Sequence, residues 1–257
     1  KRMTSRRSLK DLPASSGRVF YISASQLLDY HQCPAKYDFS RKLAPKKQPS
    51  PQIRDGIAVH ELMAGKEQLS VRASKRAVDV LESLDRFVSR RYEISGREIK
   101  QEITLSSEIH LLRTVDAIAT DGLGPVVIDY KITNRQWDVI PELNLAPRAA
   151  GFQAQCYLIP SGDNWPGRIH FVVADDEQIK VYEYERGRDD FANVLAAAQN
   201  MKVAWDSGRL PKNRGFLCHS YCQFRQICYD EKDAIDQYEL VENSPYRPDL
   251  RYLDDAD

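Results

Sequence analysis

Hydrophobic residues along the chain follow two different periods, and these periods divide it into helices and strands. Between residues 69 and 92 apolar side chains recur with helical spacing, as at Ala77, Leu81 and Leu84, which predicts an amphipathic helix. From residue 98 to 132 apolar and polar positions alternate, which predicts strands separated by tight turns. Because both periods occur in one chain, the pattern predicts a mixed α/β fold.

Further elements are predicted before and after this central stretch. Ser23 or Ser25 can cap a short helix that continues through Tyr30, because serine at an N-cap accepts a hydrogen bond from the first turn. The order of elements contains no internal repeat. The remaining predicted elements are helices over 55–64, 147–159 and 189–205 and a hairpin with strands over 168–174 and 178–185.

The balance of charge narrows the possible functions. The 257 residues include 37 Lys and Arg and 37 Asp and Glu, so the formal net charge is +0. Bulk positive charge therefore does not hold a nucleic acid on this chain, although local basic patches are not excluded. Candidate patch residues are Arg41, Lys42, Lys46, Lys47, Arg72, Lys75, Arg76, Arg86, Arg90 and Arg91, with Arg135 and Trp137 after the predicted strands.

The two ends of the chain differ from its middle in composition. Residues 1–18 are basic and poor in apolar side chains, so we expect a flexible arm, and residues 230–257 form an acidic tail. Residues 19–229 are expected to form the folded domain. No apolar run approaches the ~18 residues of a membrane span, and no secretory leader is recognised. We therefore expect a cytoplasmic protein with no membrane partner.

An acidic pair lies on two neighbouring strands of the predicted sheet. If the turn is centred between Gly122 and Leu123, Asp116 faces Asp129 across the hairpin. Like charges directly opposite each other destabilise a sheet. A divalent cation offsets them, and carboxylate oxygens are ligands that Mg²⁺ and Mn²⁺ prefer. Lys131 shares the face of Asp129, because side chains alternate along a strand.

A second interpretation of this hairpin is open. D-x-K is a weak pattern, and Asp129 with Lys131 can equally form a salt bridge on an exposed strand face. Asp116 would then be an ordinary polar residue near a turn. The apolar residues beside Asp129 favour the functional interpretation, because a carboxylate in an apolar strand is costly unless it is paired or bound to a cation.

Two other segments carry polar groups that can join such a site. Gln153 and Tyr157 are four residues apart in a predicted helix and share one of its faces. An amide and a phenol can hold a phosphate there, and a polar pair on a helix surface is the alternative. His60 lies on another predicted helix, where a neutral imidazole can complete the coordination of a metal. A core histidine is the alternative for His60.

The cysteines are distributed unevenly along the chain. Cys33 lies near one end, and Cys218, Cys222 and Cys228 lie close together near the other. In a reducing compartment this spacing indicates a metal centre rather than disulfides. A distant cysteine plus a triplet favours a [4Fe–4S] cluster, which takes four thiolates, and zinc is the alternative. The fifth, Cys156, is expected to face the core as a small hydrophobic residue.

The order of these motifs resembles a known family. The motifs are S-A-S-Q-L and Cys33-Pro34, G-x-x-x-His60, Asp116, I-Asp129-Y-Lys131, Gln153-x-x-x-Tyr157 and the three C-terminal cysteines. In this order they resemble the PD-(D/E)xK nucleases of the RecB and AddB type. The similarity is greatest to the iron–sulfur branch with AddB, the CRISPR-associated RecB-like exonucleases and exonuclease V. It implies a restriction-endonuclease-like core, a central mixed β-sheet flanked by helices, within residues 19–229.

The resemblance implies a role for each matched position in the site. The implied ligands of Mg²⁺ or Mn²⁺ are His60, Asp116, Asp129 and the main-chain carbonyl of Tyr130. Lys131 matches the lysine that positions the attacking water and stabilises developing charge. The implied substrate contacts are Gln153 and Tyr157.

The resemblance also implies that the cysteines join the two ends of the domain. Cys33, Cys218, Cys222 and Cys228 match the ligands of a [4Fe–4S] cluster. Three residues separate Cys218 from Cys222, whereas the family usually has two. A loop accommodates one extra residue easily, so the [4Fe–4S] cluster is still favoured. The unusual spacing nevertheless supports zinc more than the usual spacing would.

The function implied by the resemblance is a metal-dependent DNA exonuclease that hydrolyses phosphodiester bonds of single-stranded DNA or duplex ends. It would act in recombination, repair, phage DNA processing or CRISPR spacer acquisition, with helicase, recombination or CRISPR proteins as possible partners. The alternative is a non-catalytic or partner-dependent DNA-binding subunit of a helicase–nuclease complex, although this chain keeps both acids and the lysine. An iron–sulfur DNA glycosylase is disfavoured, because such enzymes carry their cysteines in one C-terminal loop.

Overall fold

The structure, a computed structural model, divides the chain into two compact units. It describes residues 19–45, 50–132, 145–175, 178–212, 222–229 and 237–240. The central unit consists of Pro49–Ile103 and Leu112–Val194. The terminal unit contains both ends of the chain and consists of Lys1–Gln48, Thr104–Leu111 and Leu195–Asp257.

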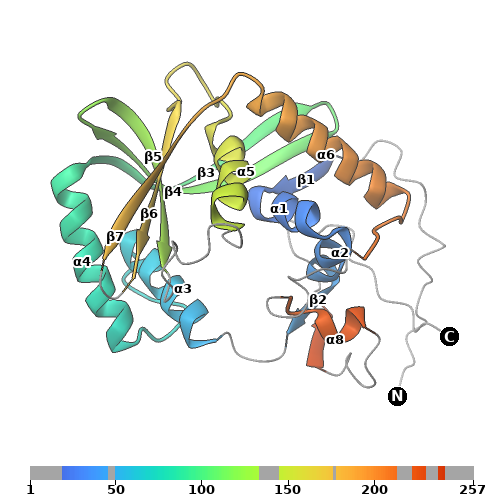
Figure 1. Cartoon of the computed structure of the whole chain (residues 1–257), viewed down its shortest axis with the longest axis horizontal. Coiled ribbons are helices and arrows are strands. Elements are labelled where there is room, and N and C mark those ends of the chain that lie inside the picture. The colour runs from blue at the N-terminus through green and yellow to red at the C-terminus, as the bar shows by residue number, and fades with distance from the viewer. Residues whose placement is uncertain are drawn as a thin grey trace. The chain divides into compact units, whose positions relative to one another are not determined.

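The central unit is built on a mixed β-sheet (Figure 1). The strands of the sheet that lie wholly or mostly in this unit are β3 (Glu93–Ser106), β4 (Ile109–Asp121), β5 (Gly124–Ile132), β6 (Arg168–Ala174) and β7 (Ile179–Glu185). They follow the order β4-β5-β6-β7, and β3 pairs with β4. β5 is antiparallel to β4 and parallel to β6, while β7 returns antiparallel to β6. The crossover from β5 to the parallel β6 includes helix α5, as such a connection requires.

Helices cover both faces of this sheet. They are α3 (Pro51–Met63), α4 (Lys75–Arg91) and α5 (Leu145–Leu158). α3 and α4 pack on the face that carries Val126, Ile128 and Tyr130, which belong to one buried apolar cluster with both helices. α5 packs on the opposite face, where Gln153 contacts Asp129. The layers are therefore helix, sheet and helix, which confirms the predicted α/β class with a mixed sheet flanked by helices.

Two boundaries differ from the predicted ones for local reasons. α4 starts at Lys75 rather than near residue 69, because Ser74 is its N-cap and accepts a hydrogen bond from the N–H of Ala77 at 3.1 Å. β3 starts at Glu93 rather than 98. Glu98 has a φ of 48°, and the alternation of buried and exposed positions is interrupted there. The sequence pattern therefore does not predict the first half of the strand.

The terminal unit joins segments from both ends of the chain. Its described elements are β1 (Phe20–Ser23), α1 (Ala24–Gln32), α2 (Pro34–Lys42), β2 (Leu43–Pro45), most of α6 (Asp190–Asp206), α8 (Arg225–Cys228) and β8 (Tyr238–Leu240). Ser23 and Gln26 form a capping box at the start of α1. β2 pairs antiparallel with β8. Phe39 packs on Phe224 with ring centroids 5.8 Å apart.

Several predictions concern segments that are only partly described. The basic arm 1–18 lies outside the described residues. Of the acidic tail 230–257, Tyr238–Leu240 form β8, and the single folded domain over 19–229 stays a prediction. No helix in the described ranges combines the length and the apolar character that a membrane crossing needs.

Candidate active site

The two predicted acids lie where the β4–β5 hairpin opens. The strands pair from Asp121↔Gly124 to Ala117↔Ile128, which is the predicted register. The next position along each strand is Asp116 and Asp129. There the carboxylate of Asp116 accepts a hydrogen bond from the main-chain N–H of Tyr130 at 2.7 Å. The Asp116 side chain thus holds the end of the hairpin and stays close to Asp129.

Asp129 is a buried carboxylate with partners on two sides. It is 3% exposed, and its Oδ2 lies 2.5 Å from Nζ of Lys131 in an ion pair. Gln153 Nε2 donates to its Oδ1 at 3.3 Å. Burial raises the pKa of Asp129, and the nearby charge of Lys131 opposes this shift. No group in the described ranges offers Oδ2 a hydrogen bond of normal geometry, so this oxygen can accept a further cationic partner.

His60 approaches the acids from helix α3. Its Nδ1 lies 3.2 Å from Oδ2 of Asp116, and its ring is edge-on to Tyr130 with centroids 6.5 Å apart. Burial lowers the pKa of His60, but the hydrogen bond to Asp116 and the charges of Asp116 and Asp129 outweigh it, so the pKa is raised overall. His60 is therefore placed as a neighbour of the acids rather than as an isolated core histidine.

Helix α5 brings the remaining predicted pair to Asp129. Gln153 Nε2 also donates to Oη of Tyr157 at 2.9 Å. Burial raises the pKa of Tyr157, and the charge of Asp129 raises it further. The phenol is therefore neutral at ordinary pH and remains a hydrogen-bond donor. The Gln153 amide links both side chains, as helical spacing of four residues predicts.

The structure places the six predicted side chains in two contacting groups of the central unit, His60 with Asp116, and Lys131 with Asp129, Gln153 and Tyr157, at neighbouring positions of the hairpin. Tyr130 contributes its N–H to the first group, and its side chain lies on the other face of the sheet. Metal ligation by its carbonyl stays a prediction.

The donor set suits a hard divalent cation. The two carboxylates are oxygen ligands that Mg²⁺ and Mn²⁺ prefer, and the imidazole adds a nitrogen donor that can complete a metal's coordination. In the structure the ammonium of Lys131 forms an ion pair with Asp129, and the imidazole of His60 contacts the carboxylate of Asp116. No group of three or more His, Cys, Asp or Glu among the described residues is already arranged around a metal position.

The predicted cluster cysteines belong to the terminal unit. Cys33 lies between α1 and α2, Cys222 lies just before α8, and Cys228 is buried at the end of α8. Cys218 lies outside the described residues. The thiol donors fit an iron–sulfur cluster or zinc by their chemistry, but the three described thiols are not arranged around a common metal position. Cys156 is 0% exposed and burial raises its pKa to about 12, so its predicted place in the core is confirmed.

A role for Arg113 was not predicted from the sequence, although this residue holds the helix that carries Gln153 and Tyr157. It is 3% exposed, and its NH1 nitrogen donates to the carbonyls of Tyr157 at 2.7 Å and Ile159 at 2.6 Å. The Arg113 guanidinium lies 4.0 Å from the centroid of the Trp165 ring. Burial lowers the pKa of Arg113 to about 10.

Carbonyl groups and a helix end balance the charge of this buried arginine. Nε and NH2 of Arg113 both donate to Oε1 of Gln101, at 2.9 and 2.7 Å. Trp165 Nε1 donates to the Tyr157 carbonyl at 2.8 Å. The C-terminus of a helix carries partial negative charge, which stabilises a cation placed there. Arg113 and Trp165 together set the position of α5 on the sheet. An isolated arginine in a strand pattern was the only sequence signal.

Some of the residues that were predicted to form basic patches make contacts that stabilise the fold. Arg41 is 1% exposed and lies 4.6 Å above the ring of Trp205. Arg76 lies 3.4 Å from Asp55 in an ion pair. Arg86 and Arg90 are exposed on α4. Lys46, Lys47, Arg135 and Trp137 lie outside the described residues.

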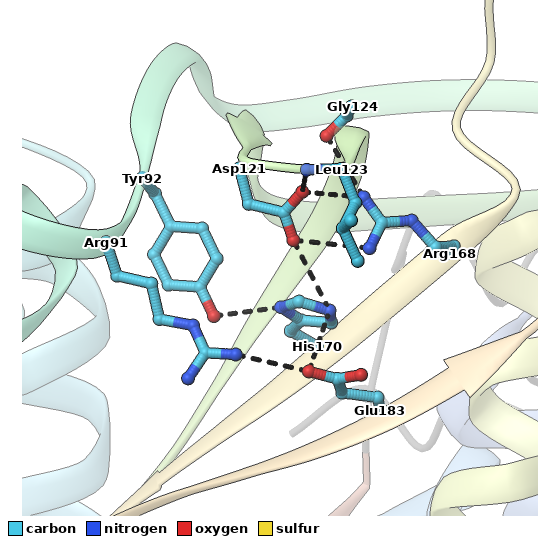
Figure 2. A network of polar contacts seen from close by, with 8 residues as sticks. All are labelled: Arg91, Tyr92, Asp121, Leu123, Gly124, Arg168, His170 and Glu183. Atoms are coloured by element: carbon cyan, nitrogen blue, oxygen red, sulfur yellow. Dashed lines mark hydrogen bonds and ion pairs between the residues drawn. The ribbon is translucent and has the colours of Figure 1, made fainter.

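A second polar cluster lies at the closed end of the same hairpin (Figure 2). Asp121 accepts hydrogen bonds from Arg168 at 2.7 and 3.2 Å and from the N–H of Leu123 at 2.8 Å. These hydrogen bonds, chiefly from Arg168, lower the pKa of Asp121 to about 2. Behind them, His170 is 1% exposed and shares a 2.8 Å hydrogen bond between its Nδ1 and Oη of Tyr92.

A search of solved structures finds proteins similar to this chain, some of them described as exonucleases. A "Putative exonuclease" from Eubacterium rectale is 12% identical, with a TM-score of 0.51 over 89% of this chain and 94% of that chain. SSO0001 is 17% identical, with a TM-score of 0.47 over 86% and 89%. The alkaline exonuclease LHK-Exo from Laribacter hongkongensis is 14% identical, with a TM-score of 0.40 over 76% and 93%. The first of these supports the fold alone.

A comparison with family models assigns the chain. No curated protein sequence matches it significantly. The model of the PD-(D/E)XK nuclease superfamily matches residues 66–229, more than half of the chain. This range includes both acids of the hairpin, Lys131 and the Gln153–Tyr157 pair. The chain belongs to the PD-(D/E)XK nuclease superfamily.

Proposed function

We propose that this protein is a metal-dependent DNA exonuclease that hydrolyses phosphodiester bonds of single-stranded DNA or of duplex ends. The observation that carries the proposal is the surroundings of Asp129. A buried carboxylate is held between Lys131 and Gln153, directly beside Asp116 and its partner His60. A carboxylate whose pKa is raised by burial next to specific charge partners is typical of a functional site.

The proposed site would hold Mg²⁺ or Mn²⁺ through Asp116, Asp129, His60 and the carbonyl of Tyr130. When bound, such an ion supplies charge neutralisation on the phosphate and lowers the pKa of water. The N–H of Tyr130 fixes the Asp116 carboxylate in place. Side chains that are already positioned need little reorganisation when the ion binds.

Lys131 has a different proposed role. Its side chain is 30% exposed, so the ammonium can leave Asp129 and reach a phosphate from solvent. There it would orient the attacking water and offset the negative charge that builds on the phosphate oxygens. Gln153 and the neutral Tyr157 would keep Oδ1 of Asp129 oriented and donate to a phosphate oxygen.

We also propose that Cys33, Cys218, Cys222 and Cys228 hold a [4Fe–4S] cluster, with zinc as the alternative. The support is that the described segments from both ends lie together in the terminal unit: the N–H of Ala35 donates to the carbonyl of Pro211 at 3.3 Å. Anaerobic purification followed by iron and zinc analysis and visible absorption separates the two metals. Cys33→Ser should lose the metal, and Cys156→Ser should keep it because Cys156 is buried in α5.

The proposed activity fits recombination, repair, phage DNA processing or CRISPR spacer acquisition. A helicase or other partner chain would supply the single strand where the DNA begins as a duplex. The test is incubation of the purified protein with end-labelled single- and double-stranded DNA in Mg²⁺, Mn²⁺ or EDTA. The position of the label in the products reports the polarity.

Asp116→Asn is the diagnostic variant and Asp163→Asn its matched control, because Asp163 is exposed between α5 and β6. We expect metal-dependent degradation that falls ~100-fold or more in Asp116→Asn and is retained in the control. A folded, metal-loaded protein that binds DNA without cutting it would instead be a partner-dependent DNA-binding subunit.

A further inference from the structure

The ammonium of Lys131 has two partners in the central unit, one charged and one aromatic. Its Nζ lies 2.5 Å from Oδ2 of Asp129. The same nitrogen lies over the ring of Phe171, 5.8 Å from the ring centroid. The ion pair belongs to the proposed active site, and the aromatic contact extends that site by one residue.

The sheet places Phe171 beside Asp129 on the face that carries the site. Phe171 of β6 is the register partner of Asp129 of β5. Paired residues of adjacent strands project from the same face, and Lys131, two residues after Asp129, does so too. Val172, the next residue of β6, belongs to the buried cluster with α3 and α4 on the opposite face. The side chain of Lys131 therefore leans back along β5 to reach both Asp129 and the ring.

The ring of Phe171 is a fixed surface for this ammonium. The side chain is buried, and its strand is paired along both edges, because Phe171 aligns with Asp129 of β5 on one side and with Tyr182 of β7 on the other. Lys131 is partly exposed and has a long flexible stem. Contact with a ring that cannot move far limits the positions that the ammonium can take.

An aromatic face attracts an ammonium without neutralising it. The face of the ring carries partial negative charge, so a cation above it within about 6 Å is stabilised, and more strongly where water is excluded. A carboxylate accepts hydrogen bonds from the ammonium and offsets its full charge. A ring has no formal charge and leaves the N–H donors for water and for phosphate oxygens. Phe171 can thus hold Lys131 in place while the charge of Lys131 acts on the reacting phosphate.

We propose that Phe171 is a positioning residue, which keeps the ammonium of Lys131 beside the acids when Lys131 turns from Asp129 to the phosphate. The inference rests on the proposed function, since Lys131 has a phosphate to act on only if the protein is a nuclease. Asp129 holds Lys131 less tightly once its charge is shared with the proposed cation, so the ring then limits the motion of the ammonium. Loss of the ring should lower kcat and leave KM nearly unchanged, because it affects the reacting geometry and not the binding of DNA.

The test changes the charge distribution of the ring while nearly keeping its shape. Phenylalanine analogues with one, two and three ring fluorines are incorporated at Phe171, because each fluorine withdraws electrons and weakens the attraction of the ring for a cation. We expect kcat on single-stranded DNA to fall stepwise, by about fivefold with three fluorines, while KM stays within about twofold. Phe171→Leu, which has no ring, should lower kcat about tenfold.

Each arm of this test has a matched control. The ring of Phe39 packs on the ring of Phe224, an aromatic partner instead of a cation, so the same analogues at Phe39 should leave kcat and KM unchanged. Val173→Ala is the control for Phe171→Leu. Val173 is buried on the same strand and face and is the register partner of Lys131, so this variant removes volume but no ring. Its kcat should stay within about threefold of the wild type, measured where all variants are folded.

A second measurement needs no cleavage. The fluorine NMR resonance of the singly fluorinated ring at Phe171 is recorded in EDTA, once with Lys131 present and once in Lys131→Met. Removal of an ammonium that lies over the ring should shift this resonance. The same substitution should leave the resonance of a fluorinated Phe39 where it was.

Several outcomes would overturn the positioning role of Phe171. One is a kcat that does not depend on the number of fluorines, or that rises with it, since the ring would then be idle or would hold Lys131 back. Another is an equal loss of kcat in Phe171→Leu and Val173→Ala, which would assign the effect to packing. An unchanged fluorine resonance in Lys131→Met would mean that the ammonium does not contact the ring. Failure of the nuclease proposal is read separately, from wild-type cleavage and its loss in Asp116→Asn. The positioning role would then fall with it, whereas the fluorine resonance would still decide whether the contact exists.

Discussion

The two ends of the β4–β5 hairpin carry aspartates in opposite states. At the closed end, Asp121 accepts hydrogen bonds from Arg168 and from a backbone N–H, and its pKa falls to about 2. At the open end, Asp129 is buried, its Oδ2 is held by the ammonium of Lys131, and burial raises its pKa. Hydrogen bonds favour the charged form at the closed end, so that carboxylate stabilises the fold. Burial disfavours the charged form at the open end, which is the state we propose for a carboxylate that binds a cation.

The sharpest way to test this contrast is to neutralise each aspartate in turn. Asp129→Asn should lower nuclease activity about 10³-fold or more, because the site loses a ligand and a charge. Its free energy of unfolding at pH 7 in EDTA should not fall, since the buried charge is removed and Lys131, 30% exposed, can turn to water. Activity assays and urea denaturation measure the two effects.

Asp121→Asn should do the reverse. Activity should remain, while the free energy of unfolding should fall by about 1–3 kcal/mol, because charged hydrogen bonds to Arg168 are lost. If both variants lost activity and stability together, the two ends of the hairpin would not have separate roles.

Arg113→Met tests whether the catalytic end depends on the position of α5. The variant leaves the carbonyls of Tyr157 and Ile159 without their shared donor. We expect a loss of about 2–4 kcal/mol in stability and a fall in kcat of about tenfold or more, because small displacements of reacting groups are costly. KM should change little.

Arg168→Met is the matched control for that measurement. It removes the ion pair with Asp121 and so lowers stability, but it leaves α5 in place. An Arg113→Met protein with wild-type kcat, measured at a temperature where all variants are folded, would show that α5 needs no such anchor.

The pH dependence of the free energy of unfolding should report the state of Asp121 at the closed end of the hairpin. The folded pKa of Asp121 lies below its ordinary value of 3.8, so the folded state binds fewer protons than the unfolded state across this range. Stability from this group is therefore complete above about pH 4 and is lost as pH falls towards 2. Denaturation curves from pH 5 to 2 should be less steep in pH for Asp121→Asn than for the wild type.

The smallest effect is expected behind Asp121. Tyr92→Phe removes the hydrogen bond to the buried Nδ1 of His170 and should cost about 1 kcal/mol. A shift of a few degrees in Tm measures it, with nuclease activity unchanged. A loss of activity in this variant would connect the closed end of the hairpin to catalysis and break the comparison.

Much of the hairpin could be predicted because its information is local. Turn residues at positions 121–124 set the register, and the alternation of side chains then puts Lys131 on the face of Asp129. The i, i+4 spacing likewise predicted that Gln153 and Tyr157 meet. His60 was placed through the order of family motifs, because a single histidine on a helix carries no spacing signal of its own.

Other features depend on contacts between distant segments, and the pattern of hydrophobic and polar residues could not predict them. Arg113 binds carbonyls of a helix more than forty positions away. Sequence periodicity shows that α4 is amphipathic, but not which part of the sheet it covers.

The pairing of β2 with β8 has a consequence for the order of folding. The central unit has all of its residues once Val194 has been synthesised. The terminal unit must wait for Tyr238–Leu240, because these residues pair with Leu43–Pro45. Such a long closure is slow relative to local contacts. On the ribosome the sheet that carries Asp116 and Asp129 can therefore form first. Leu43–Pro45 stays an unpaired edge that a chaperone or a second chain can reach until Tyr238–Leu240 have been synthesised.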